Sequence, residues 1–232
     1  MSLSALPLLW VMVTLLAYQA ASGIYRRSGR HPLANPVLIS VTLVVGVLRL
    51  TNTPYQTYFD GAQLVHVLLG PATVALAVPL YAQIERLKTM LWPLTVTLLV
   101  GSVTAIGSAV AIGRACGAST DILLSLAPKS ATMPIAMGVT AQIGGLPSLT
   151  ALTVTLTGIS GALMARGLLR LLRIDDATVC GFALGLTAHA IGTASAFQVS
   201  ASAGAFAALA MGLNGVATTV LLPLLVHLAM SH

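Results

Sequence analysis

Long apolar stretches alternate with short polar ones along the whole chain, and their spacing predicts an all-helical integral membrane protein. Crossing the hydrocarbon core of a bilayer takes about 20 residues of apolar helix. Eight stretches come near that length, at about residues 3–23, 35–50, 62–82, 91–113, 120–140, 146–170, 178–198 and 203–228. No polar region between them is large enough to fold as a soluble domain. The pattern therefore predicts a single membrane domain over residues 1–232.

Composition supports a membrane protein and argues against a nucleic-acid-binding one. The chain is 57% hydrophobic and only 7% charged, whereas about 25% of residues are charged in soluble domains. The net charge of +6 comes from basic residues scattered at segment ends without interleaved aromatics. Cys116 and Cys180 lack metal-ligand spacing and are expected to be small core residues. The N-terminus lacks the features of a signal peptide, so a multi-pass protein of a bacterial inner membrane is the simplest expectation.

The distribution of basic residues tests whether all eight stretches cross the membrane. If they do, Arg26–Arg30 and Arg86–Lys88 lie on one side and Arg166–Arg173 on the other, which breaks the positive-inside rule. If 120–140 enters and leaves by the same face, eight of the eleven basic residues share one side. We therefore expect about seven transmembrane helices and one re-entrant segment, with the N-terminus outside and the C-terminus cytoplasmic. Eight full crossings are the alternative.

The re-entrant arrangement also predicts an inverted repeat of three-helix units with interrupted helices. "NPVLISVTLVVGVL" and "LPSLTALTVTLTGI" are weakly alike, and "LGPATVALAVPLY" and "LTAHAIGTASAF" both carry helix breakers or loosening residues. Paired interrupted segments indicate the binding site of a transporter, although small residues also serve helix packing. The predicted parts are an N-terminal helix with a basic loop over 1–32, a first repeat over 33–115, the re-entrant segment over 116–142 and a second repeat over 143–232.

Lys129 is the one basic residue that lies away from a predicted membrane surface, in "SLAPKSATMPIAMG". A charge at that depth costs about 3 to more than 10 kcal/mol unless it has water or a partner. The acidic residues all lie near the boundaries of predicted spans, so none is placed to pair with it; they are Asp60, Glu85, Asp121, Asp175 and Asp176. Two interpretations are open: Lys129 extends to the interface from a shallow loop, or it is the counter-charge of an anionic substrate.

Two further polar residues lie inside predicted spans. His189 lies at the centre of an interrupted helix, where it could bind substrate, carry a proton or be satisfied by a neighbouring carbonyl. Asn214 could line a cavity or bond another helix. The sequence holds no recognisable catalytic motif, and the adjacent Lys129 and Ser130 make a weak dyad because neighbours on a helix point in different directions. We therefore predict no enzyme activity, no metal site and no cofactor.

Five ordered motifs resemble the LrgB/CidB family of antiholin-like membrane proteins, and a similar region occurs in the plastid glycolate/glycerate transporter. The motifs are "LGPATVALAVPLY" at 69–81, "PKSATMPIAMG" at 128–138, "IGGLPSLTALTVTLTGISGA" at 143–162, "LTAHAIGTASAF" at 186–197 and "GAFAALAMGLNG" at 204–215. The resemblance covers about residues 33–228. It implies either export of small monocarboxylates or control of murein hydrolases and lysis. Acidic residues common in the family after the PIAM segment are replaced here by "GVTAQIGG".

The leading hypothesis is a secondary transporter or facilitator of monocarboxylates such as glycolate, glycerate, pyruvate or lactate, working by alternating access. The alternative is a holin-like or antiholin-like oligomer that modulates murein hydrolases. The resemblance implies a separate LrgA-type small membrane protein as a possible partner, and we expect a homo-oligomer, with a dimer as the first guess. The nominated substrate-binding residues, of which His189 is also the proton-coupling candidate, are Thr73, Lys129, Ser130, Thr132, Pro134, His189, Gly192, Thr193 and Asn214.

Overall fold

The protein is built of helices, as its hydropathy pattern predicts. The computed structural model describes residues 7–29, 34–68, 71, 74–75 and 77–230, and every regular element in these ranges is a helix. The chain divides into two compact units, Met1–Ala77 and Val78–His232. Five described helices are long and apolar enough to cross a membrane, namely α1 (Pro7–Arg27), α8 (Leu91–Ala115), α11 (Pro147–Leu171), α12 (Ala177–Phe197) and α13 (Ala201–Met230). The prediction of an all-helical membrane protein is confirmed.

The first unit packs α1 against α2 (Pro36–Leu50), followed by the short helices α3 (Tyr55–Gly61) and α4 (Gln63–Val67). Asn35 begins α2 as the sequence predicts, because its side-chain oxygen accepts the N–H groups of Val37 and Leu38 at 2.9 and 3.3 Å. The rings of Trp10 and Tyr58 are nearly perpendicular, with their centroids 5.8 Å apart. This ring contact ties α1 to α3.

The predicted span 62–82 is not one continuous helix. Its described parts include α4, which ends at Val67, and α6 (Ala77–Tyr81). This agrees with the helix breakers seen in the sequence there, since proline removes a helical hydrogen bond and disturbs the preceding turn. The short helix α7 (Ile84–Thr89) then leads into α8.

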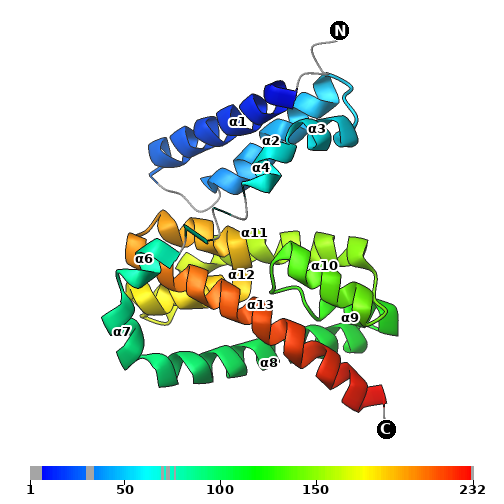
Figure 1. Cartoon of the computed structure of the whole chain (residues 1–232), viewed down its shortest axis with the longest axis vertical. Coiled ribbons are helices and arrows are strands. Elements are labelled where there is room, and N and C mark those ends of the chain that lie inside the picture. The colour runs from blue at the N-terminus through cyan, green and yellow to red at the C-terminus, as the bar shows by residue number, and fades with distance from the viewer. Residues whose placement is uncertain (1–6, 30–33, 69–70, 72–73, 76, 231–232) are drawn as a thin grey trace. The chain divides into compact units, whose positions relative to one another are not determined.

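In the second unit, α8 and α13 run in the same direction (Figure 1). Leu94 of α8 shares a buried cluster with Phe206 of α13. Further along, the Ser102 hydroxyl donates to Asn214 at 2.8 Å. Residue numbers therefore rise together along the contact, and Ile106 and Leu222 continue the series in a second buried cluster.

The segment predicted to be re-entrant is a helical hairpin, which we call the first hairpin (residues 120–142). It consists of α9 (Thr120–Leu126), a break at 127–132 and α10 (Met133–Gln142). The Ser125 hydroxyl accepts the N–H of Leu146 at 2.7 Å, so the chain beyond α10 returns to α9. A crossing segment would instead separate its ends by about 30 Å.

Helix α12 is itself a hairpin, and we call its residues 177–197 the second hairpin. His189 has φ 42° and ψ −131°, which breaks the helix. A Cβ added at Gly192 would lie 2.4 Å from the carbonyl oxygen of Leu184, and Leu184 and Ala196 share a buried cluster. Residues so far apart cannot meet in a straight helix, which rises 1.5 Å per residue. The helix therefore reverses at His189, and the predicted span 178–198 is not a straight crossing.

Helix α11 links the two hairpins and runs opposite to α8 and α13. Near its start, the Thr150 hydroxyl donates to the carbonyl of Ser125, in α9 of the first hairpin, at 3.0 Å. Nearer its end, Ala165 packs against the buried cluster that contains Leu184 and Ala196 of the second hairpin. Helix α11 thus packs against the first hairpin near its start and against the second hairpin nearer its end.

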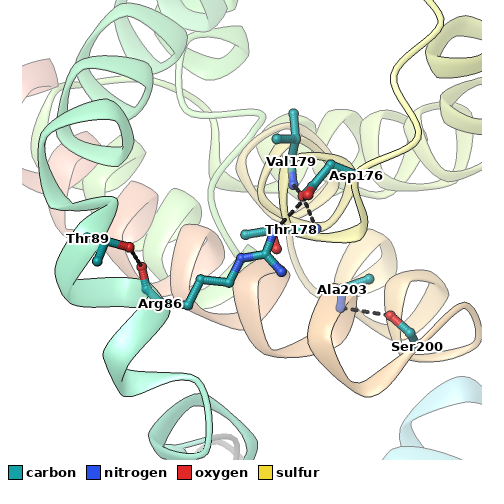
Figure 2. Close-up of polar contacts among 7 residues, drawn as sticks. All are labelled: Arg86, Thr89, Asp176, Thr178, Val179, Ser200 and Ala203. Carbon is teal, nitrogen blue, oxygen red and sulfur yellow. Dashed lines mark hydrogen bonds and ion pairs between the residues drawn. The ribbon is translucent and has the colours of Figure 1, made fainter.

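Polar contacts fix the starts of α12 and α13 and join α12 to α7 (Figure 2). Asp176 accepts the N–H groups of Thr178 and Val179 at 2.8 and 3.1 Å and pairs with Arg86 at 2.7 Å. Ser200 accepts the N–H of Ala203 at 3.0 Å. A Cβ at Gly181 would lie 2.1 Å from the carbonyl oxygen of Ala203, so the first parts of α12 and α13 touch backbone to backbone.

Candidate functional site

The break of the first hairpin brings Lys129 to the wall of a cavity of about 550 Å³. The cavity lies among α8, the first hairpin, α11 and the second hairpin, and most of its lining is apolar. Its polar lining consists of Lys129 and six hydroxyl-bearing side chains, which are Thr104, Ser108, Ser130, Thr157, Ser160 and Thr187. A mostly apolar hollow with a few converging polar groups is the usual form of a small-molecule site.

Half of these hydroxyls are free to bind a ligand. Those of Ser108, Ser160 and Thr187 donate to carbonyls of their own helices. No hydroxyl partner is found among the described residues for Ser130 or for the two threonines, Thr104 and Thr157. The cavity therefore offers one cationic group and three unengaged hydroxyl groups.

Lys129 has no acidic partner in the part of the chain that the structure describes. The ion pairs found there are Arg86–Asp176 and Lys88–Glu85, and no carboxylate lines the cavity. Lys129 itself is half-buried. Because a cation in apolar surroundings is stabilised by an anion or by water, the cavity suits a small anion.

Asn214 joins the two hairpins rather than lining the cavity. Its side-chain nitrogen donates to the carbonyl of Ser130, at the break of the first hairpin, at 3.0 Å. The same nitrogen donates to the carbonyl of Leu186, just before the break of the second hairpin, at 3.2 Å. Its oxygen accepts the Ser102 hydroxyl. Of the two interpretations of Asn214, the structure favours bonding between helices.

His189 also has a protein partner. Its Nε2 lies 2.9 Å from the carbonyl oxygen of Val154 in α11, so Nε2 must carry the hydrogen. His189 is only 4% exposed and is not among the cavity-lining residues. The Thr193 hydroxyl donates to the His189 carbonyl at 2.9 Å. Satisfaction by a neighbouring carbonyl, one of the interpretations left open by the sequence, is what the structure shows.

The other nominated residues are spread around the two breaks. Thr132 and Pro134 stand at the start of α10, Thr132 without a side-chain capping bond. Gly192 and Thr193 lie behind His189, in the returning helix of the second hairpin. Thr73 lies outside the described residues. The cavity lining thus brings together only Lys129 and Ser130 of the nominated set.

Two cavity threonines, Thr104 and Thr157, were missed by sequence reasoning. Each belongs to a stripe of small or hydroxyl residues at helical spacing, 101, 104, 105 and 108 on α8 and 157, 160, 161 and 165 on α11. Such stripes also occur wherever membrane helices pack closely. The signal is present in the sequence, but it becomes specific only when both stripes are seen to face Lys129.

One expectation about the cysteines is wrong. Cys116 is exposed at the end of α8, whereas the sequence predicted a core residue. It follows the last turn of α8 and precedes Gly117, whose positive φ of 76° marks the turn between α8 and α9. Among the described residues, no group of three His, Cys, Asp or Glu side chains could hold a metal ion.

The fold and the cavity define a helical membrane protein in which two broken segments meet near a cationic cavity. The model of the LrgB-like family matches residues 14–228, and the chain belongs to this family. It is similar to the uncharacterized protein YwbG of Bacillus subtilis (strain 168), with 37% identity covering 93% of this chain and 95% of the relative. It is 28% identical to the antiholin-like protein LrgB of Bacillus mycoides (strain KBAB4), covering 94% and 95%. No solved structure gives a significant match.

Proposed function

We propose that the protein is a secondary transporter or facilitator that moves a small monocarboxylate anion across the membrane. The observation that carries this proposal is the position of Lys129, which stands in a helix break on the wall of a cavity that has no carboxylate. Helices broken inside a membrane protein are tolerated where they line a cavity. In transporters they form the substrate site.

In this proposal, the carboxylate group of the substrate binds the polar groups on the cavity wall. Its oxygens accept hydrogen bonds from the Lys129 ammonium and from the Ser130 and Thr157 hydroxyls. The first N–H groups of α10 have no partner within the helix, and they add partial positive charge beside the break. A cavity of about 550 Å³ holds an acid of the glycolate, glycerate, pyruvate or lactate class together with water.

The remaining features of this proposal follow the sequence hypothesis. The protein resides in a bacterial inner membrane, and a separate LrgA-type protein and a second copy of this chain are its candidate partners. His189 holds the second hairpin against α11 through Val154, so we assign it an anchoring role rather than the predicted proton-coupling role.

The second candidate is an antiholin-like protein that modulates murein hydrolases without carrying a substrate. The names of the relatives favour it, because the Bacillus mycoides and Bacillus cereus proteins are called antiholin-like. In that case the cavity would have no cargo, and the Lys129 side chain could be replaced without loss of function.

A flux assay separates the two candidates. Purified protein is reconstituted into liposomes, and entry of labelled glycolate, pyruvate and lactate is measured for the wild type, Lys129→Ala and Lys88→Ala. Lys88→Ala is the matched control, because it removes the same charge from an exposed ion pair. We expect saturable entry of at least one acid, a loss of roughly tenfold or more with Lys129→Ala, since hydrogen bonds to charged groups contribute about 1.5–3 kcal/mol, and little change with Lys88→Ala.

The control variants also show what would overturn the proposal. No saturable flux of any acid with correctly folded wild type would contradict transport. Equal loss in both lysine variants would show a general effect of charge and would remove Lys129 from the site.

A further inference from the structure

The second unit contains two segments of the same design. Each begins with a hairpin broken near its middle and continues, after a short turn, into one long helix. The first segment, residues 120–171, is the first hairpin followed by α11. The second, residues 177–230, is the second hairpin followed by α13. Because α11 runs opposite to α13, the two segments have opposite orientations.

Reciprocal contacts relate the two segments. A Cβ added at Gly158 of α11 would lie 2.8 Å from the end of Ile191, in the returning helix of the second hairpin. A Cβ added at Gly215 of α13 would lie 2.7 Å from the end of Ile135, in the returning helix of the first hairpin. Each long helix thus uses a glycine to receive an isoleucine of the opposite hairpin.

The sequence around these glycines repeats as well. Residues 156–160 read "LTGIS" and residues 213–217 read "LNGVA". Thr157 and Asn214 take equivalent places directly before the two glycines. Thr157 faces the cavity, and Asn214 binds the carbonyls at both breaks. The residues at equivalent positions in the two segments therefore both contribute to the same central region, Thr157 to the cavity and Asn214 to the two breaks.

We propose that residues 120–171 and 177–230 are two inverted hairpin–helix repeats whose hairpins enter the membrane from opposite faces and meet at the Lys129 cavity. This proposal replaces the sequence prediction that 33–115 and 143–232 are the repeats. It also places the C-terminus on the outer side, whereas the sequence prediction placed it in the cytoplasm. Access of an anion past the hairpins rests on the proposed transport function, but the arrangement of the repeats does not.

The depth of the hairpins agrees with this arrangement. The outgoing helix of the second hairpin, residues 177–188, is about 18 Å long at 1.5 Å per residue, which is about half the thickness of a bilayer with its polar layers. The breaks meet at Ser102 and Asn214, near the middle of α8 and α13. Both breaks therefore lie near mid-depth.

The charges assign the two faces. Arg86 pairs with Asp176, so the turn before α8 lies at the base of the second hairpin. Arg170 and Arg173, at the end of α11, precede this base. The positive-inside rule makes this face cytoplasmic. The base of the first hairpin and the end of α13 then lie on the outer face, with Cys116 beside them.

The inverted pair supplies a gate on each side of the anion site. The first hairpin separates Lys129 from the outer face, and the second hairpin separates it from the cytoplasmic face. Asn214 holds the carbonyls of Ser130 and Leu186 from one amide group, so both gates share a single anchoring residue. Alternating access then consists of releasing one hairpin from this anchor while the other stays bound.

Cysteine labelling in intact cells tests the arrangement without any transport measurement. Native Cys116 is exposed, and it is probed alone in a Cys180→Ser variant. Val199→Cys and Leu228→Cys, at positions 52% and 50% exposed, are each introduced into a Cys116→Ser, Cys180→Ser background. A membrane-impermeant maleimide is applied to intact and to permeabilised cells, and only variants that elute as folded protein are scored.

We expect Cys116 and the Leu228→Cys variant to be labelled in intact cells and the Val199→Cys variant to be labelled only after permeabilisation. Labelling of the Val199→Cys variant together with Cys116 in intact cells would overturn the second hairpin as a re-entrant element. Labelling of the Leu228→Cys variant only after permeabilisation would restore a cytoplasmic C-terminus. Absence of flux in liposomes would sink the transport function but would leave these labelling results unchanged.

Discussion

Single glycines decide how closely the helices of the second unit approach. A Cβ at Gly185 would lie 1.9 Å from the carbonyl oxygen of Ala207, and backbone cannot move aside as a flexible side chain can. The contact lets α12 and α13 pack with their backbones nearly touching, which is a common source of stability between membrane helices. Glycine occupies position 185 because there is no room for a Cβ atom, and the greater backbone flexibility of glycine is the lesser reason.

Gly185→Ala is therefore expected to destabilise the protein, and Gly212→Ala is the matched control. Nothing lies within 4 Å of a Cβ at Gly212, so there the higher helix propensity of alanine is expected to stabilise by up to about 1 kcal/mol. Thermal unfolding in detergent should show a lower Tm for Gly185→Ala and an equal or higher Tm for Gly212→Ala. A Tm for Gly185→Ala at or above that of the wild type would contradict the close approach of α12 and α13.

Lys129 and its neighbours show which residues of the candidate site could be predicted from the sequence. The cost of a charge at that depth singles out Lys129 from the sequence alone, and Lys129 and Ser130 do line the cavity. The positions of His189 and Asn214 are also notable in the sequence, but their partners are not. Val154, Ser102 and Leu186 are far from them along the chain, so no local pattern could distinguish an anchor from a ligand.

The start of α12 is a polar junction at which Asp176 binds two backbone N–H groups and Arg86. The N–H of Val179, together with that of Thr178 and the Arg86 guanidinium, lowers the pKa of Asp176 below its ordinary value. These contacts favour the ionised carboxylate, as is typical of an N-cap that also forms an ion pair. The carboxylate thereby stabilises the base of the second hairpin.

This junction predicts a pH dependence of stability. Because the pKa of Asp176 is lower in the folded than in the unfolded state, its stabilising effect is full above the unfolded value of about 3.9 and is lost as pH falls below it. Asp176→Asn keeps a capping side chain but does not titrate. The Tm of the wild type should therefore fall relative to that of Asp176→Asn between about pH 5 and pH 3. Parallel Tm curves over this range would show that Asp176 contributes nothing through its charge.

The first hairpin could be predicted from sequence patterns, whereas the second could not. The first is expected to be re-entrant, because that arrangement places eight of the eleven basic residues on one side of the membrane. The second reads as an interrupted span, since the glycines on either side of His189 only suggest loosening. Its full reversal depends on a positive φ at a histidine, which is rare for non-glycine residues. Contacts with α11 and α13 stabilise that conformation. These contacts cannot be predicted from the hydropathy pattern.

For the whole molecule, the proposed pair of repeats rests on the directions of α8, α11 and α13. The sequence suggests an inverted repeat but assigns it to 33–115 and 143–232, because α12 counts there as a crossing. One hidden reversal changes the orientation of every residue that follows it. A membrane topology deduced from charge is therefore correct only if the number of crossing helices is correct. When the second hairpin is not counted as a crossing, the positions of Arg86, Arg170 and Arg173 agree with the positive-inside rule.

The central claim is that an anion occupies the cavity at Lys129, and the chain provides its own control because Lys88 and Lys129 are its only lysines. In reconstituted protein, the rate of acylation of each lysine by an amine-reactive reagent is followed by mass spectrometry, with and without glycolate, lactate or pyruvate. We expect at least one acid to slow the reaction of Lys129 severalfold and saturably, while Lys88 reacts at an unchanged rate. Equal rates at Lys129 with and without every acid would contradict the claim.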